Sequence, residues 1–176
     1  MQKSLIRALC SLLLFAAASA LKAADTDITG FWKIIDDETG RLRSIIALYQ
    51  HQDKLYGRLV VTFHEDETVK NTIYAPVERA TALPDQPFFA GLDIVWDLRW
   101  DGNKQRWDKG KILDPKKGKV YSSHISWDAK KQQLVVRGKI GPFGRNQFWL
   151  RAEDKDFPAD FVLPDTSSWT PKIPRT

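Results

Sequence analysis

Residues 110–151 read GKILDPKKGKVYSSHISWDAKKQQLVVRGKIGPFGRNQFWLR and predict a run of antiparallel strands. Strand-like segments alternate here with three turn signals. Asp114-Pro115 opens the first turn, which Gly118 can close with a positive φ. Asp128 starts the second turn, and the glycines on either side of Pro142-Phe143 make the third. Strands spaced this closely are typical of an all-β meander, folded as a barrel or as a sandwich.

The same alternation continues upstream of this stretch. A first strand is expected at 30–35, and the others at 44–51, 54–64, 94–100, 106–113, 119–128, 133–141 and 145–152, with a possible edge strand at 72–79. In the third strand, Leu55, Gly57, Leu59, Val61 and Phe63 should share one face. Residues 65–90, interrupted by prolines and charges, are expected to form a long connection, often a lid or binding loop.

The first 20 residues have the pattern of an export signal. Lys3 and Arg7 precede a short apolar run at 9–17, and Ala18-Ser19-Ala20 is a small-x-small cleavage site. The run is too short to span a bilayer as an anchor. We therefore expect a signal peptide at 1–20, with a cut near Ala24 as the alternative, and a periplasmic or secreted protein without a transmembrane segment.

Cysteine usage and charge narrow the class of protein further. Cys10 is the only cysteine, and it precedes most of the apolar run, so neither lipidation nor a disulfide is expected. Removing Lys3 and Arg7 lowers the net charge from +5 to +3. Five lysines, at 116, 117, 119, 130 and 131, fall at predicted turns, where solvation explains them. An anionic envelope surface is the functional alternative, and no nucleic-acid partner is expected for an exported chain.

The C-terminal segment differs in composition from the strands. Four prolines in 153–176 exclude a regular strand or helix, yet Phe157, Phe161 and Trp169 are too apolar for a free tail. The domain plan is therefore a barrel domain at 25–152 and a proline-rich tail at 153–176, packed in part on the barrel.

The motifs of common enzymes are missing. None of His51, His64 and His124 sits in a nucleophile motif. The run 64–67 (His-Glu-Asp-Glu) resembles a metal cluster, but neighbouring side chains on a strand point to opposite faces, and a solvated acidic turn is the simpler interpretation. A pair of carboxylates for glycoside cleavage is harder to exclude, because Asp97, Asp108 and Asp114 could meet across strands. No spacing demands such a pair, and turn chemistry explains Asp114. The prediction is no enzymatic activity, no metal and no cofactor.

Aromatic residues on the strands leave two possibilities open. All seven tryptophans follow the expected signal, and each either fills a core or lines a pocket. An eight-stranded barrel holds either its own side chains or one small ligand.

Six motifs give the sequence a family resemblance. They are Gly-x-Trp at 30–32, Asp-Asp-x-Thr-Gly at 36–40, Leu-Tyr-Gly at 55–57, Gly-Lys-Ile-x-Asp-Pro-x-x-Gly-x-x-Tyr at 110–121, Val-Arg-Gly-x-x-Gly at 136–141, and Gly-Arg-x-Gln-x-Trp-x-Arg at 144–151. The chain resembles a bacterial family of secreted proteins of unknown function. It departs from the pattern at Asn146, where threonine is usual, and in its long tail.

The resemblance implies a single antiparallel up-and-down lipocalin-like barrel of about eight strands. Such barrels carry small hydrophobic or amphipathic molecules, and no enzymatic activity is established for the family. Gly30, Trp32 and Arg151 are the implied structural signature, with the arginine packed over the indole where the first and last strands meet.

Large or polar residues on the strands are the candidates for a ligand pocket: Tyr49, Trp96, Tyr121, Arg137 and Gln147. Arg137 is a possible partner for a ligand carboxylate, or else faces water. The alternative function is a filled barrel that acts as an envelope interaction or assembly module, whose protein partner the sequence does not identify.

Overall fold

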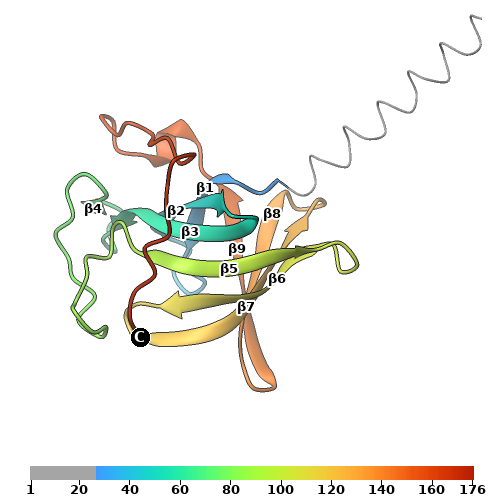
Figure 1. The fold of residues 1–176 in the computed structure, drawn as a ribbon. Coiled ribbons are helices and arrows are strands. Elements are labelled where there is room, and N and C mark those ends of the chain that lie inside the picture. Colours follow the sequence, from blue (N-terminus) through green and yellow to red (C-terminus); the bar gives the residue numbers. More distant parts are fainter. Residues whose placement is uncertain (1–26) are drawn as a thin grey trace, which may run out of the picture.

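The computed structural model describes residues 27–176, which form a closed β-barrel with one extra strand and a long C-terminal tail (Figure 1). The elements are β1 (Gly30–Ile35), β2 (Leu42–His51), β3 (Lys54–Phe63), β4 (Val69–Thr72), β5 (Asp93–Asp101), β6 (Arg106–Asp114), β7 (Lys119–Asp128), β8 (Gln133–Ile140), β9 (Phe143–Arg151) and a short 3-10 turn, η1 (Asp154–Asp156). The expected signal at 1–20, Cys10 included, lies outside the described residues.

The barrel closes through its first and last strands. The hydrogen-bonded order is β2-β1-β9-β8-β7-β6-β5-β3, and β2 also pairs with β3, so eight antiparallel strands form a ring. The prediction of an all-β antiparallel barrel is confirmed, and the sandwich alternative is excluded. β1 pairs with β2 on one side and with β9 on the other, so closure leaves no free strand edge there.

The extra strand β4 pairs with β3 outside the ring. It covers Val69–Thr72 and so ends where the expected edge strand at 72–79 was to begin. The reason lies in Asn71, whose side-chain oxygen accepts the backbone N–H groups of Val77 and Glu78 at 2.7 and 2.6 Å. These donors are therefore committed to a side chain and not to a strand ladder.

The side chains of β3 change from one face of the sheet to the other along the strand. Ile45 pairs with Val61, whereas the next residue, Ile46, pairs with Leu59, so Val60 is an extra residue on β3. Such a bulge reverses the alternation. Leu55, Gly57 and Leu59 share the inner face as predicted, but Val61 and Phe63 belong to a second cluster on the outer wall; the prediction was wrong for these two residues.

The main core is a cluster of buried aromatic and aliphatic side chains. All seven tryptophans belong to this core cluster or pack against it, including Trp169 of the tail. Trp32 and Trp149 are fully buried, and Trp32 meets Trp127 edge-on with ring centroids 6.0 Å apart.

The tail covers the outer wall of the barrel. Phe157 packs edge-on against Phe31 at 5.6 Å and stacks on Phe161 at 5.4 Å. In Figure 1 the tail, in dark red, crosses β2, β3 and β5 before it ends beside β7. Residues 44–49 of β2 are consequently buried on both faces of the strand. Within residues 27–176, no helix has the length and apolar character needed to cross a membrane.

Candidate functional site

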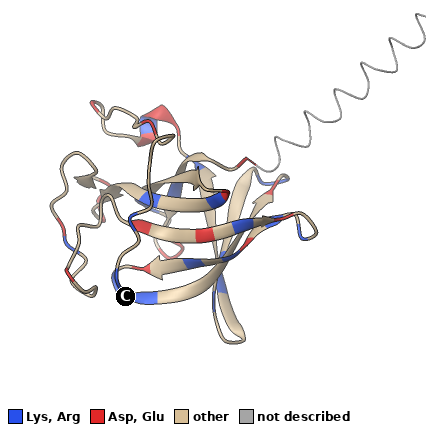
Figure 2. Ribbon diagram, viewed as in Figure 1, with Lys and Arg blue, Asp and Glu red and all other residues tan. Residues whose placement is uncertain are grey.

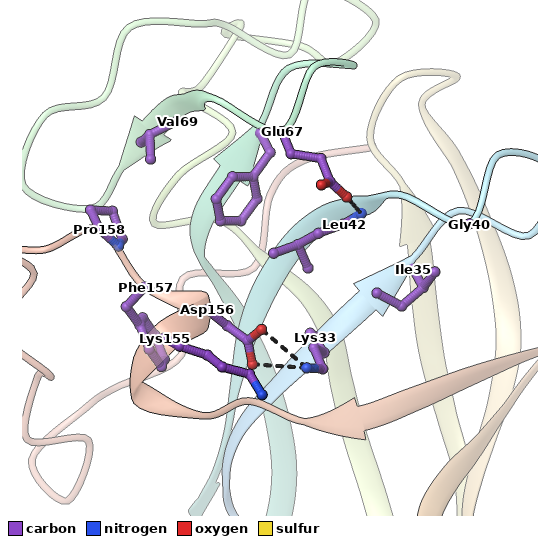
Figure 3. A pocket seen from close by; sticks show the side chains of 11 residues that line it. Lys33, Ile35, Gly40, Leu42, Glu67, Val69, Lys155, Asp156, Phe157 and Pro158 are labelled. Carbon is purple, nitrogen blue, oxygen red and sulfur yellow. Dashed lines mark hydrogen bonds and ion pairs between the residues drawn. The ribbon is translucent and has the colours of Figure 1, made fainter.

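A groove with a volume of about 440 Å³ lies on the outer wall of the barrel. It opens between the end of β1, the start of β2, the β3–β4 connection and the tail (Figure 3). Its lining residues are Lys33, Ile35, Gly40, Leu42, Phe63, Glu67, Val69, Lys155, Asp156, Phe157 and Pro158. We call this hollow the outer groove.

Local hydrogen bonds hold the sides of the outer groove. Glu153 and Asp156 form a capping box around η1, in which the Glu153 N–H donates to Asp156 Oδ2 at 2.8 Å. On the opposite side, the Leu42 N–H donates to Glu67 Oε1 at 2.8 Å. The aromatic side chains of Phe63 and Phe157 also line the groove, and Figure 3 shows Phe157 on the tail side. The groove therefore combines an apolar floor with charged margins.

Charge in the groove is concentrated on the tail side. Lys33 Nζ donates to both carboxylate oxygens of Asp156, at 3.1 and 2.9 Å. Burial opposes the charge of Asp156, but the Glu153 N–H and the Lys33 ammonium outweigh it, so the pKa of Asp156 lies below its usual range. Lys155 pairs with Glu153 at 2.7 Å and is largely exposed at the margin, where its ammonium can exchange partners.

A second, smaller hollow of about 280 Å³ lies along the same tail segment. It is lined by Asp154, Phe157, Pro158, Ala159, Phe161 and Leu163. Phe157 and Pro158 line both hollows, so the tail turn forms a wall common to the two. The tail turn therefore contributes to both hollows.

A buried charge network lies farther along the same wall. Arg58 donates to Asp93 through Nε at 3.0 Å and Nη2 at 2.9 Å, and Tyr49 donates to the same carboxylate at 2.9 Å. Burial and the neighbouring Asp93 charge raise the pKa of Tyr49, which keeps the phenol a donor. The tail completes this network, since the Thr170 carbonyl accepts from Arg58 at 2.7 Å and Trp169 lies over the guanidinium at 4.5 Å.

The five predicted pocket residues separate into two groups. Tyr121 and Gln147 face the interior: Gln147 pairs with the buried Val136, and Tyr121 lies beside Gly138. Tyr49 belongs instead to the buried network on the wall. None of the five lines either of the two hollows.

The other two candidates point away from the interior row that contains Val136. Trp96 is buried and pairs with Lys111. Arg137 lies next to Val136 on β8 and is therefore on the opposite face, where it donates to Asn146 at 2.8 Å. The residue is partly exposed on this face, which matches the alternative that it faces water.

The three signature residues meet as the resemblance implied. Trp32 pairs with Arg151 across the seam between β1 and β9, and the guanidinium carbon lies 3.9 Å from the indole centroid. Gly30 has a φ of 104°, and a Cβ there would stand 2.7 Å from Arg151 Nη1. Only glycine leaves room for this contact.

The carboxylates considered for catalysis each have local partners. Asp97 accepts from Lys54 at 2.6 Å, Asp108 from Arg106 and Lys104, and Asp114 from two backbone N–H groups of its own turn. Asp108 and Asp114 lie at the two ends of β6. In the acidic run 64–67, Asp66 accepts a hydrogen bond from the Thr68 N–H, and Glu67 accepts one from the Leu42 N–H. No group of three possible metal ligands occurs within residues 27–176.

Two features of this surface, the outer groove and the buried ion pair, are not predicted by any local sequence pattern. The outer groove needs Lys33, Phe63 and Asp156 from three distant segments, and no local pattern links them. The buried pair had one usable signal: Arg58 interrupts the apolar run 55–61, where a charge requires a partner.

Comparison with known proteins agrees with this architecture. A solved protein from Helicobacter pylori, HP1028, described as belonging to the lipocalin family, is similar with a TM-score of 0.58 and 17% identity, over 74% of this chain and 86% of that one. At this identity the similarity shows the fold. No curated protein matches the chain. The profile of the family described as an uncharacterised protein conserved in bacteria, DUF2147, matches residues 30–151. The chain belongs to this bacterial family, DUF2147, and folds as a lipocalin-like barrel.

Proposed function

We propose that the protein is an exported binding protein for a small amphipathic molecule, and that the ligand lies in the outer groove. The observation that carries the proposal is the groove itself, because its volume of about 440 Å³ falls within the range of about 300–1,000 Å³ typical of small-molecule sites. The lipocalin-like fold supports ligand binding, and the N-terminal signal pattern supports export.

The lining favours a ligand with an apolar body and an anionic head. Leu42, Phe63 and Phe157 offer an apolar floor, while Lys155 offers an ammonium at the margin. An alkyl or aryl body would bury the floor, and a carboxylate would replace Glu153 as the partner of Lys155. No catalytic group is required for this role, so we propose binding without a reaction.

The first experiment asks whether a ligand is already bound. Native mass spectrometry of protein purified from its own envelope fraction should show one small molecule per chain and give its mass. The second experiment uses a dansyl-labelled fatty acid with the chain from Asp25 onward, which contains all described strands and the tail but not the apolar N-terminus. Saturable fluorescence enhancement at one site is expected.

Two matched substitutions locate the site. Val69→Trp fills the outer groove from an exposed position and should reduce affinity by about tenfold or more, whereas Val77→Trp, exposed in the following loop and outside the groove, should leave it unchanged. Lys155→Gln should weaken binding of the fatty acid but not of the corresponding alcohol. If Tyr121→Ala abolishes binding while Val69→Trp does not, the ligand lies on the inner face and the proposal is wrong.

A further inference from the structure

The β8–β9 hairpin carries the most exposed large hydrophobic side chain among residues 27–176. Phe143 is 79% exposed, and its cross-strand neighbour Ile140 is 54% exposed. Both stand at the tip of the hairpin, beside Gly141 and Pro142. Because the two side chains are cross-strand neighbours, they form one continuous apolar surface at the tip and are not scattered singly.

The hairpin projects beyond the barrel that supports it. β8 pairs with β7 only as far as Lys139, and β9 pairs with β1 only from Trp149 to Arg151. The tip, residues 140–148, is therefore held by hairpin pairing alone on the β1 side, and Figure 1 shows it extending away from the ring. This position allows the tip to reach a flat surface before other elements do.

The charged side chains of the hairpin are all positive. Residues 129–152 contain no Asp or Glu, whereas Lys and Arg occur at 130, 131, 137, 139, 145 and 151 (Figure 2). The register puts Arg137 and Lys139 on one face of the ribbon and Arg145 on the other. Across from the tip, Asp37 in the β1–β2 turn pairs with Arg145 at 2.7 Å, and Asp36 in the same turn pairs with Arg43.

We propose that the tip of the β8–β9 hairpin docks on an anionic lipid bilayer. Phe143 and Ile140 enter the boundary between headgroups and acyl chains, and Arg137 and Lys139 contact lipid phosphates, with Arg145 exchanging Asp37 for a phosphate. An apolar point flanked by cations is the arrangement that binds at such an interface, because apolar burial and electrostatic attraction act together. A protein groove would offer Phe143 a pocket but would not need cations on both faces of the ribbon.

The test uses cosedimentation of the chain from Asp25 onward with two kinds of vesicle. One is pure phosphatidylcholine, and the other is two parts phosphatidylcholine to one part phosphatidylglycerol. Binding should be confined to the second kind and should weaken as salt is raised. Phe143→Ser should lower the partition coefficient by about tenfold, and the double change Arg137→Gln with Lys139→Gln by at least as much.

Val77→Ser is the control, because Val77 is 73% exposed on a different loop. It should bind vesicles like the parent chain. Thermal unfolding of all variants should be unchanged, since Phe143, Arg137, Lys139 and Val77 are all outside the buried core. The proposal is overturned if Phe143→Ser binds as well as the parent, if neither vesicle binds, or if Phe143 instead drives concentration-dependent dimerisation in sedimentation equilibrium.

Discussion

Arg58 and Asp93 are joined by two parallel hydrogen bonds inside the wall of the barrel. The C-terminal tail adds one partner for each residue, the Thr170 carbonyl for Arg58 and the Lys172 N–H for Asp93. Arg58 is 5% exposed and Asp93 is fully buried. Besides Arg58, the carboxylate accepts from Tyr49 and from the Lys172 N–H. Every charge in this network therefore has a partner, which is the condition under which a buried ion pair is tolerated.

Removing one member of this pair should destabilise the protein strongly. Asp93→Ala leaves the Arg58 guanidinium buried without its counter-ion and should lower the free energy of unfolding by about 3–5 kcal/mol. The double variant Arg58→Met with Asp93→Leu should cost much less, because no charge is left unpaired. Urea denaturation monitored by tryptophan fluorescence measures both values.

The control for this prediction is an exposed ion pair. Glu78→Ala removes the partner of Lys70, both of which are about one-third exposed, and should change stability by no more than about 1 kcal/mol. If Asp93→Ala costs no more than Glu78→Ala, the buried network does not stabilise the wall as described.

The seam between the first and last strands predicts an energetic coupling. Trp32→Ala should lower stability by about 3–5 kcal/mol through lost core volume. Arg151→Lys should cost about 1 kcal/mol, since an ammonium stacks less well on the indole. Because the two residues share one contact, the double variant should cost less than the sum of the two changes.

The coupling is measured by a double-mutant cycle in urea. Trp127→Phe with Arg151→Lys offers a comparison, because Trp127 contacts Trp32 and no cation–π contact joins it to Arg151. Additive costs for Trp32 and Arg151 would mean that the stacking contributes nothing to closure.

Acid should loosen the outer groove through Asp156. The pKa of this group is lower in the folded chain than its ordinary value of 3.8, so the unfolded chain binds a proton first as pH falls. The contribution of Asp156 to the free energy of unfolding is therefore fully present above about pH 5. It is lost as the pH falls below the pKa of the unfolded chain and through the lower pKa of the folded chain. Asp156→Asn should remove this part of the pH dependence.

The measurement compares urea midpoints of the parent chain and Asp156→Asn between neutral pH and pH 3. The difference between the two chains should be constant at higher pH and shrink below about pH 4. The Lys33→Met chain should behave like Asp156→Asn at neutral pH, since each removes the same ion pair. A difference that stays constant down to pH 3 would contradict the assignment.

Strand positions and closure followed from the sequence because they depend on local alternation and on turn residues. Lys119–Asp128 is recovered with both of its bounds, and Gly30–Ile35 likewise. Alternation could not say which face of β2 meets the lumen, because the tail buries the outer face as completely as the core buries the inner one. Tyr49, predicted as a pocket residue because it is a large polar residue on a strand, lies instead in the wall beside Asp93.

The candidate site was less predictable, for a reason of register. Arg58 meets Asp93 only because β3 and β5 pair with shifts at Leu55–Gly57 and Gly57–Arg58. A shift of one residue would point Arg58 into the lumen. The outer groove likewise depends on the position of η1. The ion pair between Lys33 and Asp156, which lie 123 positions apart in the sequence, holds η1 against β1.

The docking of the tail also sets an order of events during biosynthesis. β1 is made early but must wait for β9, since the Arg151–Thr29 hydrogen bond joins residues 122 positions apart. Pairings this distant make folding slow. The tail leaves the ribosome after every strand, and only then are Arg58 and Asp93 sealed from water. A chain that ends at the family boundary near 151 would form its ring with a wet, uncovered wall, so the tail, which lies beyond the family match, decides whether Arg58 and Asp93 are buried.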